Sequence, residues 1–215
     1  MLDFSTENLI KNKKDNCLIF GVDEVGRGPL AGPVVAAAFW IDPNYYQQDF
    51  PFKELVRDSK KLSSSQREKI FQSFESCDFI KYELADVSNI IIDKINILQS
   101  SLLAMRLAVE QLREKMERLK KMPIELLVLI DGNKKIPKAK FEQRVFPGGD
   151  QKIFSIAAAS ICAKVARDRM MDQWHEKYPD YGFDRHRGYG TKFHYEMIDK
   201  YGILPIHRQS FNLRK

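Results

Sequence analysis

Short continuous apolar runs alternate along this chain with longer segments in which apolar residues recur at helical spacing. The runs at 18–22, 34–40, 79–87 and 126–130 have the length and composition of strands, and a shorter strand is expected at 143–146. Helical patterns cover 65–74, 88–95, 96–122, 152–176 and 192–200. This order predicts an α/β protein with a mixed β-sheet flanked by α-helices and with a C-terminal helical portion.

Two local features refine this expectation. The connection at 26–33 is too short for a parallel crossover, so the first two strands should form an antiparallel hairpin. The pattern Ser65-Gln66-Arg67-Glu68 resembles a capping box at the start of a helix. Residues 1–16 are polar and rich in Lys and Asn, and they indicate a loose N-terminal lead-in or a short helix.

The composition limits the class of protein. A length of 215 residues, of which 44% are hydrophobic, suits one domain over 1–215 with a substantial core. The three cysteines are widely spaced, which excludes a zinc knuckle and a disulfide framework. No apolar run reaches the length of a membrane span, and no signal pattern opens the chain. We therefore expect a cytoplasmic protein without a membrane partner, and nothing in the sequence requires more than a monomer. The net charge of +6 favours polyanionic partners.

The most informative residues are acids at the ends of two apolar runs. The first run stops on Asp23-Glu24, just before a glycine-rich segment, and the run at 126–130 stops on Asp131. A buried carboxylate is costly unless a cation or hydrogen bonds compensate it. Two such strand ends side by side would form a site for hard cations. Oxygen ligands alone favour Mg²⁺ or Mn²⁺, and a pair of such ions is the usual device for phosphodiester hydrolysis.

Two further acids compete for a fourth position in this site. Asp150 follows two glycines and precedes a long helical pattern, so it is a candidate site residue and a candidate helix N-cap. Asp168 stands between Arg167 and Arg169, where a salt bridge is the expected role and catalysis the alternative. A cap or a salt bridge also remains the alternative for any single strand-end acid.

The segment 23–35, which contains Gly26-Arg27-Gly28, resembles the signature of ribonuclease HII, the prokaryotic type 2 ribonuclease H. The resemblance continues in the same order through most of 18–211, in the blocks Asp58-Ser59-Lys60-Lys61-Leu62-Ser63, Ile130-Asp131-Gly132, Gly149-Asp150, 157–168, His186-Arg187-Gly188-Tyr189-Gly190-Thr191 and His207-Arg208-Gln209-Ser210-Phe211. One block could arise by chance, but this series is specific. Gly148 departs from the family, which often has a basic residue there, and Arg27 distinguishes the chain from type HIII, which usually has lysine.

The resemblance implies a ribonuclease H-like fold and endonucleolytic cleavage of RNA in RNA–DNA hybrids. It also implies incision on the 5′ side of a ribonucleotide embedded in duplex DNA, which leaves 3′-hydroxyl and 5′-phosphate ends. The expected partners are therefore RNA–DNA hybrids and ribonucleotide-containing duplexes. A DNA nuclease or resolvase of the same fold, and a non-catalytic nucleic-acid-binding module, are the alternatives.

Matching of the blocks also implies roles for individual residues. The metal-binding and catalytic carboxylates would be Asp23, Glu24, Asp131 and Asp150. The backbone of Gly26-Arg27-Gly28 would contact the 2′-hydroxyl group of the ribonucleotide, and Tyr189 would pack on the neighbouring deoxyribose. Arg27 and Lys60 can neutralise phosphates. Two interpretations stay open for four further basic residues. They either extend a basic track along the duplex or lie on ordinary solvated surface: Arg185, Arg187, Lys192 and Arg208.

Overall fold

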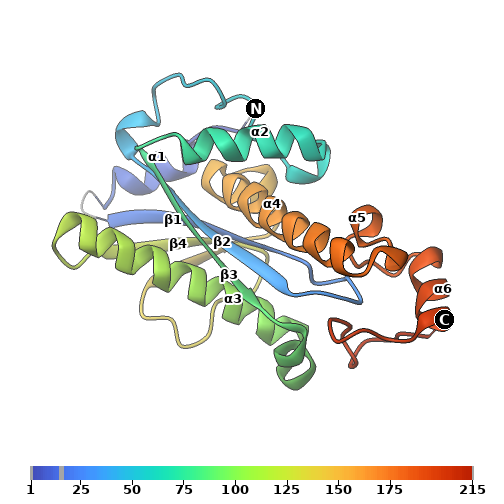
Figure 1. The fold of residues 1–215 in the computed structure, drawn as a ribbon. Coiled ribbons are helices and arrows are strands. Elements are labelled where there is room, and N and C mark those ends of the chain that lie inside the picture. Colours follow the sequence, from blue (N-terminus) through green and yellow to red (C-terminus); the bar gives the residue numbers. More distant parts are fainter. Residues whose placement is uncertain (1, 15–16, 215) are drawn as a thin grey trace.

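The computed structural model describes residues 2–14 and 17–214. Its centre is a mixed five-stranded sheet in the order β3-β2-β1-β4-β5 (Figure 1). The strands are β1 (Cys17–Val25), β2 (Val34–Ile41), β3 (Ile80–Val87), β4 (Glu125–Asp131) and β5 (Glu142–Phe146). The pairs β1–β2 and β2–β3 are antiparallel, whereas β1–β4 and β4–β5 are parallel. The predicted hairpin and the predicted mixed sheet are confirmed.

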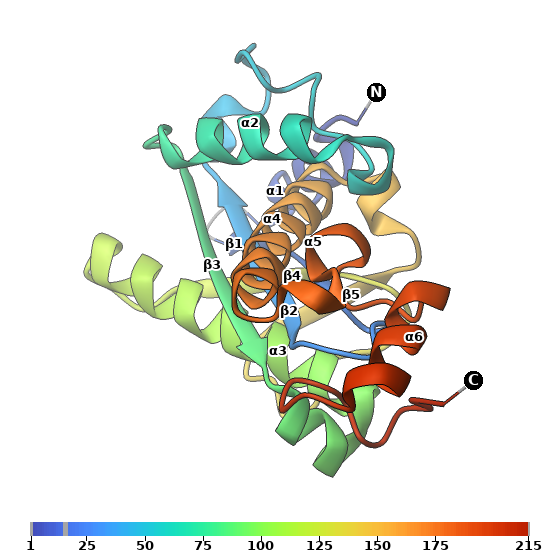
Figure 2. The same ribbon diagram turned by 45° about the vertical axis from the view of Figure 1, so that its right-hand side comes forward.

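Helices cover both faces of this sheet (Figures 1 and 2). The long helix α3 (Asn89–Lys120) packs on one face, and α4 (Phe154–Lys177) packs on the other. Side chains of β1 alternate between the two faces, so that Phe20 and Val22 pack toward α3 while Ile19 packs toward α4. Burial on both sides explains why the central strands are nearly continuous apolar runs.

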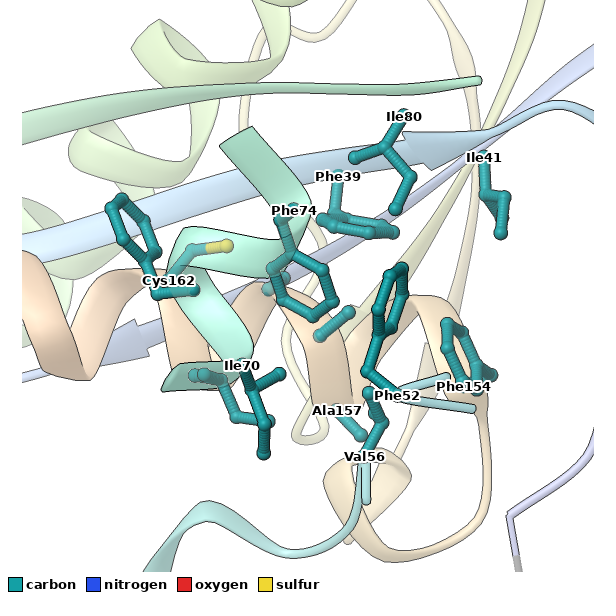
Figure 3. Packing of buried hydrophobic residues seen from close by; sticks show 14 of the residues in the cluster. Phe39, Ile41, Phe52, Val56, Ile70, Phe74, Ile80, Phe154, Ala157 and Cys162 are labelled. Carbon is teal, nitrogen blue, oxygen red and sulfur yellow. The ribbon is translucent and has the colours of Figure 1, made fainter. Parts of the chain in front are cut away.

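The face under α4 depends on small residues and on aromatic packing. A Cβ atom at Gly21 of β1 would lie 2.2 Å from the backbone carbon of Ser155, so the first turn of α4 contacts the strand directly. Helix α2 (Ser64–Glu75) packs outside α4, and helix α1 (Ser5–Lys11) lies nearby. Figure 3 shows Phe39 of β2 and Phe74 of α2 in contact in this layer, with ring centroids 5.0 Å apart.

Helix α3 contains the break that the sequence predicts. Its backbone leaves the helical region at Asn96, where φ is 67° and ψ is 164°. The Asn96 side chain accepts a hydrogen bond from the Gln99 N–H group at 3.1 Å, and so caps the second segment. Few residues other than glycine adopt this pair of angles, so the cap hydrogen bond and the helical segments on either side hold the break at Asn96.

Three local expectations are corrected. The capping box of α2 pairs Ser63 with Gln66, not Ser65 with Glu68. Asp150 lies in a 3₁₀ turn (Gly149–Gln151), and the residue that precedes α4 is Ile153, so Asp150 is not the N-cap of that helix. Of the two expectations for the N-terminal segment, the loose lead-in is wrong over Ser5–Lys11 and the short helix is confirmed, and its buried Glu7 accepts hydrogen bonds from the Ser155 N–H and hydroxyl groups at 3.0 and 2.8 Å. Residues 1, 15 and 16 of that segment lie outside the described residues.

The C-terminal portion is helical, as expected. It consists of a 3₁₀ turn (Pro179–Tyr181), α5 (Phe183–His186), α6 (Lys192–Tyr201) and a final extended segment. Further 3₁₀ turns cover Pro43–Tyr45 and Ser59–Lys61. Within the described ranges, no helix is both long enough and apolar enough to cross a bilayer.

Three histidines lie together inside this C-terminal portion. His194 and His207 are buried, and the ring of His186 stacks on that of His194 with centroids 4.4 Å apart. Burial lowers the pKa of all three imidazoles, and it lowers the pKa of His194 to about 4. The folded protein therefore holds these rings in the neutral form at neutral pH.

This burial predicts acid sensitivity. An imidazole with a folded-state pKa near 4 and an ordinary value of 6.5 contributes stability above pH 6.5 and loses it as the pH falls toward 4. Urea unfolding of the metal-free protein at pH 7 and pH 4.5 should show this loss, and His194→Asn should reduce it by roughly 2 kcal/mol. An unchanged pH dependence in the variant would contradict the expectation. The comparison with wild type removes the contribution of the carboxylates, which is common to both proteins.

Candidate active site

The parallel pairing of β1 with β4 brings the two predicted strand-end acids together. Val22 pairs with Ile130, so Asp23 and Asp131 occupy the next positions on neighbouring strands, at the same edge of the sheet. Asp150 follows β5 and lies in the 3₁₀ turn packed against the start of α4. Asp23 is 5% exposed and Asp150 is 2% exposed, so these two carboxyl groups are removed from water, whereas Glu24 and Asp131 are partly buried. We refer to Asp23, Glu24, Asp131 and Asp150 as the acidic cluster.

Each carboxylate of the acidic cluster has a donor within the protein. Asp23 accepts a hydrogen bond from the Glu24 N–H group at 2.7 Å, and Asp131 accepts one from the Gly149 N–H group at 2.7 Å. Glu24 pairs with the Arg27 guanidinium at 3.4 Å. Asp150 pairs with the Lys60 ammonium at 3.2 Å, and the Lys60 side chain is otherwise 78% exposed.

The charges in this cluster oppose one another. Burial raises the pKa of Asp23 well above its usual range, and the charges of Glu24 and Asp131 raise it further. Burial also raises the pKa of Glu24, against the effect of Arg27, and Asp131 adds to the increase. The pKa of Asp131 is raised by burial and then by Asp150. Asp131 thus acts on both Asp23 and Glu24 and is itself acted on by Asp150, so a cation among these carboxylates would relieve their repulsion.

The chemistry of this cluster fits a hard divalent cation, because every donor is a carboxylate oxygen and the charges repel. Within residues 2–14 and 17–214, however, no three acidic, histidine or cysteine side chains are already arranged as ligands around one point. The carboxylates instead contact the protein donors described above. Coordination of one ion by three of these carboxylates would therefore require side chains to move.

Asp168 has a different environment. Its carboxylate lies 2.6 Å from the Lys164 ammonium, 3.4 Å from the Arg67 guanidinium and 3.8 Å from the Arg187 guanidinium. The expected salt bridge is therefore confirmed. Asp150, not Asp168, is the carboxylate whose charge acts on Asp131.

The glycine-rich turn, residues 26–33, lies directly after the acidic pair of β1. Two buried arginines donate hydrogen bonds to its carbonyl groups from the interior. Arg208 donates to the carbonyl groups of Gly26, Arg27 and Gly32, at 2.6, 3.0 and 3.0 Å. Arg167 donates to the carbonyl groups of Ala31 and Pro33, both at 3.1 Å, and to that of Arg187 at 3.0 Å. These bonds to backbone oxygens offset the cost of burying two guanidinium groups.

Gly26 is required by this arrangement. Its φ of +95° lies in the left-handed region, and a Cβ atom there would lie 2.3 Å from the Arg167 Nε atom. Arg208 is fully buried, so the expectation that it extends a basic track on the surface is wrong. Sequence reasoning missed the structural role of both arginines. The available signal was the turn itself, because a glycine- and proline-rich segment leaves many carbonyl groups that need donors.

The other predicted substrate residues surround the same turn. The Tyr189 ring faces Gly28, since a Cβ atom built on Gly28 would lie 3.3 Å from it, and Tyr189 is 44% exposed. The Arg27 side chain is about half exposed beside Glu24. Arg187, by contrast, pairs with Asp168 and Asp172 and does not form part of an open basic track. The structure thus brings the acidic cluster, the glycine-rich turn and Tyr189 to one edge of the sheet.

A mixed sheet of this topology, with acids at the adjoining ends of β1 and β4, is the architecture of a ribonuclease H-like enzyme. The family model for ribonuclease HII matches residues 20–214. The chain belongs to the ribonuclease HII family.

Individual relatives agree with this assignment. The chain is 43% identical to ribonuclease HII from Chlorobium luteolum over 215 residues, which cover 100% of this chain and 97% of the relative. It is 47% identical to ribonuclease HII from Caldicellulosiruptor bescii over 193 residues, which cover 90% of this chain and 85% of the relative. Among solved structures, ribonuclease H2 from Pyrococcus horikoshii matches with a TM-score of 0.67 at 27% identity, over 91% of this chain and 94% of that one.

These findings confirm the predicted family, fold class and enzyme class. The protein is an endonuclease that degrades RNA in RNA–DNA hybrids, and its family depends on divalent metal ions. The residue roles and the preferred metal stay predictions.

The two buried arginines give a testable prediction about the turn. Arg208→Met should lower the free energy of unfolding by about 3 kcal/mol, because three buried carbonyl groups lose their donor. It should also lower kcat/KM on an RNA–DNA hybrid at least tenfold, since the turn loses its support. Arg118→Met, at an exposed position on α3, is the matched control and should change neither quantity. Urea unfolding and steady-state kinetics measure both effects, and equal effects in the two variants would refute this role.

Proposed function

We propose that the acidic cluster binds two Mg²⁺ or Mn²⁺ ions and that the enzyme incises duplex DNA on the 5′ side of an embedded ribonucleotide. The products would carry 3′-hydroxyl and 5′-phosphate ends. The observation that carries this proposal is the register of β1 and β4, which sets Asp23 beside Asp131 and starts the glycine-rich turn two residues past Glu24. A hydrolytic site and a sugar-recognition site are then parts of one edge of the sheet.

The acidic cluster would hold the ions and orient the scissile phosphate. When bound, the ions supply charge neutralisation and an activated water molecule for in-line phosphodiester hydrolysis. Asp23 and Asp131 are fixed by strands, which keeps the carboxylates at a set spacing. Lys60 and Arg27 hold the charges of Asp150 and Glu24, and both side chains are exposed enough to turn toward a phosphate.

The glycine-rich turn supports recognition of the 2′-hydroxyl group. Arg208 draws the carbonyl groups of Gly26 and Arg27 toward the interior. The peptide bonds of this turn are trans, so the N–H groups of Arg27 and Gly28 point the opposite way, out of the interior. A hydroxyl group can accept a hydrogen bond from such an N–H group, and deoxyribose cannot, because it lacks the 2′-oxygen. The absence of a side chain on Gly28 leaves room for the sugar beside Tyr189.

The direct test uses a DNA duplex with a single ribonucleotide, incubated with the enzyme and Mg²⁺, and maps the ends of the products. Incision on the 5′ side of the ribonucleotide, with no cleavage of the matched all-DNA duplex, is the expected result. Faster cleavage of an all-DNA junction would instead support the nuclease or resolvase alternative. Binding without turnover would support the binding module. Cytoplasmic location and a monomeric state stay predictions.

Removal of one negative charge from the acidic cluster should lower turnover without lowering the stability of the fold. Asp131→Asn keeps an oxygen that can accept from Gly149 but removes a charge that repels Asp23, Glu24 and Asp150. We expect turnover to fall by roughly three orders of magnitude, substrate affinity to persist, and the melting temperature of the metal-free protein to rise by a few degrees. Asp86→Asn, on the exposed part of β3, serves as the control for the loss of an acid. A variant that retains most of its turnover would rule out a ligand role for Asp131.

Replacement by asparagine should mainly lower turnover at Asp150 and mainly lower stability at Asp168. Asp150→Asn should abolish most turnover with little loss of stability, because Asp150 acts on Asp131 and its ion pair is with the exposed Lys60. Asp168→Asn should lower the free energy of unfolding by about 2–3 kcal/mol, since it weakens a buried contact to three cations. Kinetics at a temperature where both variants are folded, paired with urea unfolding, distinguish them. A greater loss of turnover in Asp168→Asn would reverse the assignment.

A further inference from the structure

The backbone of Tyr189 is held on both sides, although its ring is exposed. The Tyr189 N–H group donates to the His186 carbonyl group at 2.8 Å. The Tyr189 carbonyl group accepts from the Thr191 N–H group at 2.8 Å and from the Nδ1 atom of His194 at 3.0 Å. The direction of the Tyr189 ring over Gly28 therefore depends on an imidazole that never reaches the surface.

The hydrogen-bond partners define the tautomer of each ring in turn. A carbonyl oxygen only accepts, so the Nδ1 atom of His194 carries the proton, and its Nε2 atom is an acceptor. That atom lies 3.1 Å from the Nε2 atom of His207, which must therefore donate. The Nδ1 atom of His207 is then an acceptor, and it receives the Leu204 N–H group at 2.8 Å, which is the shorter of its two contacts with Leu204, since the carbonyl oxygen lies 3.3 Å away. The shortest contacts thus form a chain of donors from Leu204 through His207 and His194 to the Tyr189 carbonyl group.

The His207 end of this series of hydrogen bonds contacts the glycine-rich turn. His207 forms a β-bridge with Ala31, and the N–H group of the next residue, Arg208, donates to the Leu30 carbonyl group at 2.8 Å. The Leu30 N–H group in turn donates to the Gly188 carbonyl group at 2.8 Å, next to Tyr189. The two buried histidines therefore connect the segment that carries Tyr189 to the turn that Tyr189 faces.

We propose that the His207–His194 pair positions Tyr189 over Gly28 and so sets how strongly the enzyme prefers a ribonucleotide–deoxynucleotide junction to a continuous RNA–DNA hybrid. This inference rests on the proposed role of Tyr189. His194 is a positioning residue, since it acts through the Tyr189 backbone and does not reach the substrate. Displacement of a contact group by about an ångström can cost up to a hundredfold in rate, so the loss of this support should be measurable.

The test compares substitutions at His194 that differ in hydrogen bonding. His194→Phe keeps an aromatic ring beside His186 but removes both nitrogen contacts, whereas His194→Asn retains a donor close to the position of Nδ1. The readout is kcat/KM on a duplex with one ribonucleotide, divided by kcat/KM on a uniform RNA–DNA hybrid. We expect His194→Phe to lower this ratio roughly tenfold and His194→Asn to restore most of it.

A double substitution separates positioning from general loosening. Tyr189→Ala should lower the same ratio, and His194→Phe should cause no further loss in that background, because both act through one ring. His175→Gln is the control, since His175 pairs with Asp184 and belongs to α4 outside this chain of donors. Should His194→Phe fail to fold, His207→Leu removes the donor to His194 and should lower the ratio in the same direction.

The outcomes distinguish the two proposals. An unchanged ratio in folded His194→Phe, with a lowered ratio in Tyr189→Ala, would overturn the positioning role and leave the role of Tyr189 intact. An unchanged ratio in Tyr189→Ala would overturn the proposed role of Tyr189, and the positioning role with it. Additive losses in the double variant, or an equal loss in His175→Gln, would show that His194 acts only on general stability.

Discussion

The parallel pairing of β1 with β4 is the contact on which the rest of the structure depends. One register, Val22 beside Ile130, determines that the next residue of each strand is an acid and that both acids share an edge. A shift by one residue would send one of the carboxylates to the opposite face of the sheet. The hydrophobic layers under α3 and α4 fix this register, because a slip would move each side chain of β1 out of the layer in which it packs and into the opposite one.

The C-terminal portion holds the glycine-rich turn and Tyr189 in place, and it adds few exposed charged side chains to the site. It does so through buried polar groups that bond to backbone oxygens: Arg208, together with Arg167 of α4, holds the glycine-rich turn, and His194 holds Tyr189. Buried groups of this kind tolerate few alternative arrangements, since each lost bond leaves a desolvated donor or acceptor. The backbone of the glycine-rich turn and of Tyr189 is thus fixed by contacts in the interior, while the exposed side chains of the site can still change conformation.

Local sequence patterns predicted the features that depend on residues close together in the sequence. Apolar runs gave the strands, the short connection gave the hairpin, and Asn96 marked the break in α3. The acidic cluster was predictable because strand ends of a parallel pair meet at one edge. The burial of Arg208 was not, because its carbonyl partners lie up to 182 residues away and a charged side chain is usually exposed. Glu7 escaped prediction for the same reason, since its partner Ser155 is 148 residues distant.

The internal partners of the acidic cluster have a consequence for how the protein exists between reactions. Lys60, Arg27 and two backbone N–H groups neutralise or solvate the carboxylates from within. The fold thus supplies counter-charges and donors to its own acids, which offsets part of the cost of burying them. A phosphate or a cation that approaches this edge therefore meets carboxylates that already have partners, and its binding exchanges one set of contacts for another.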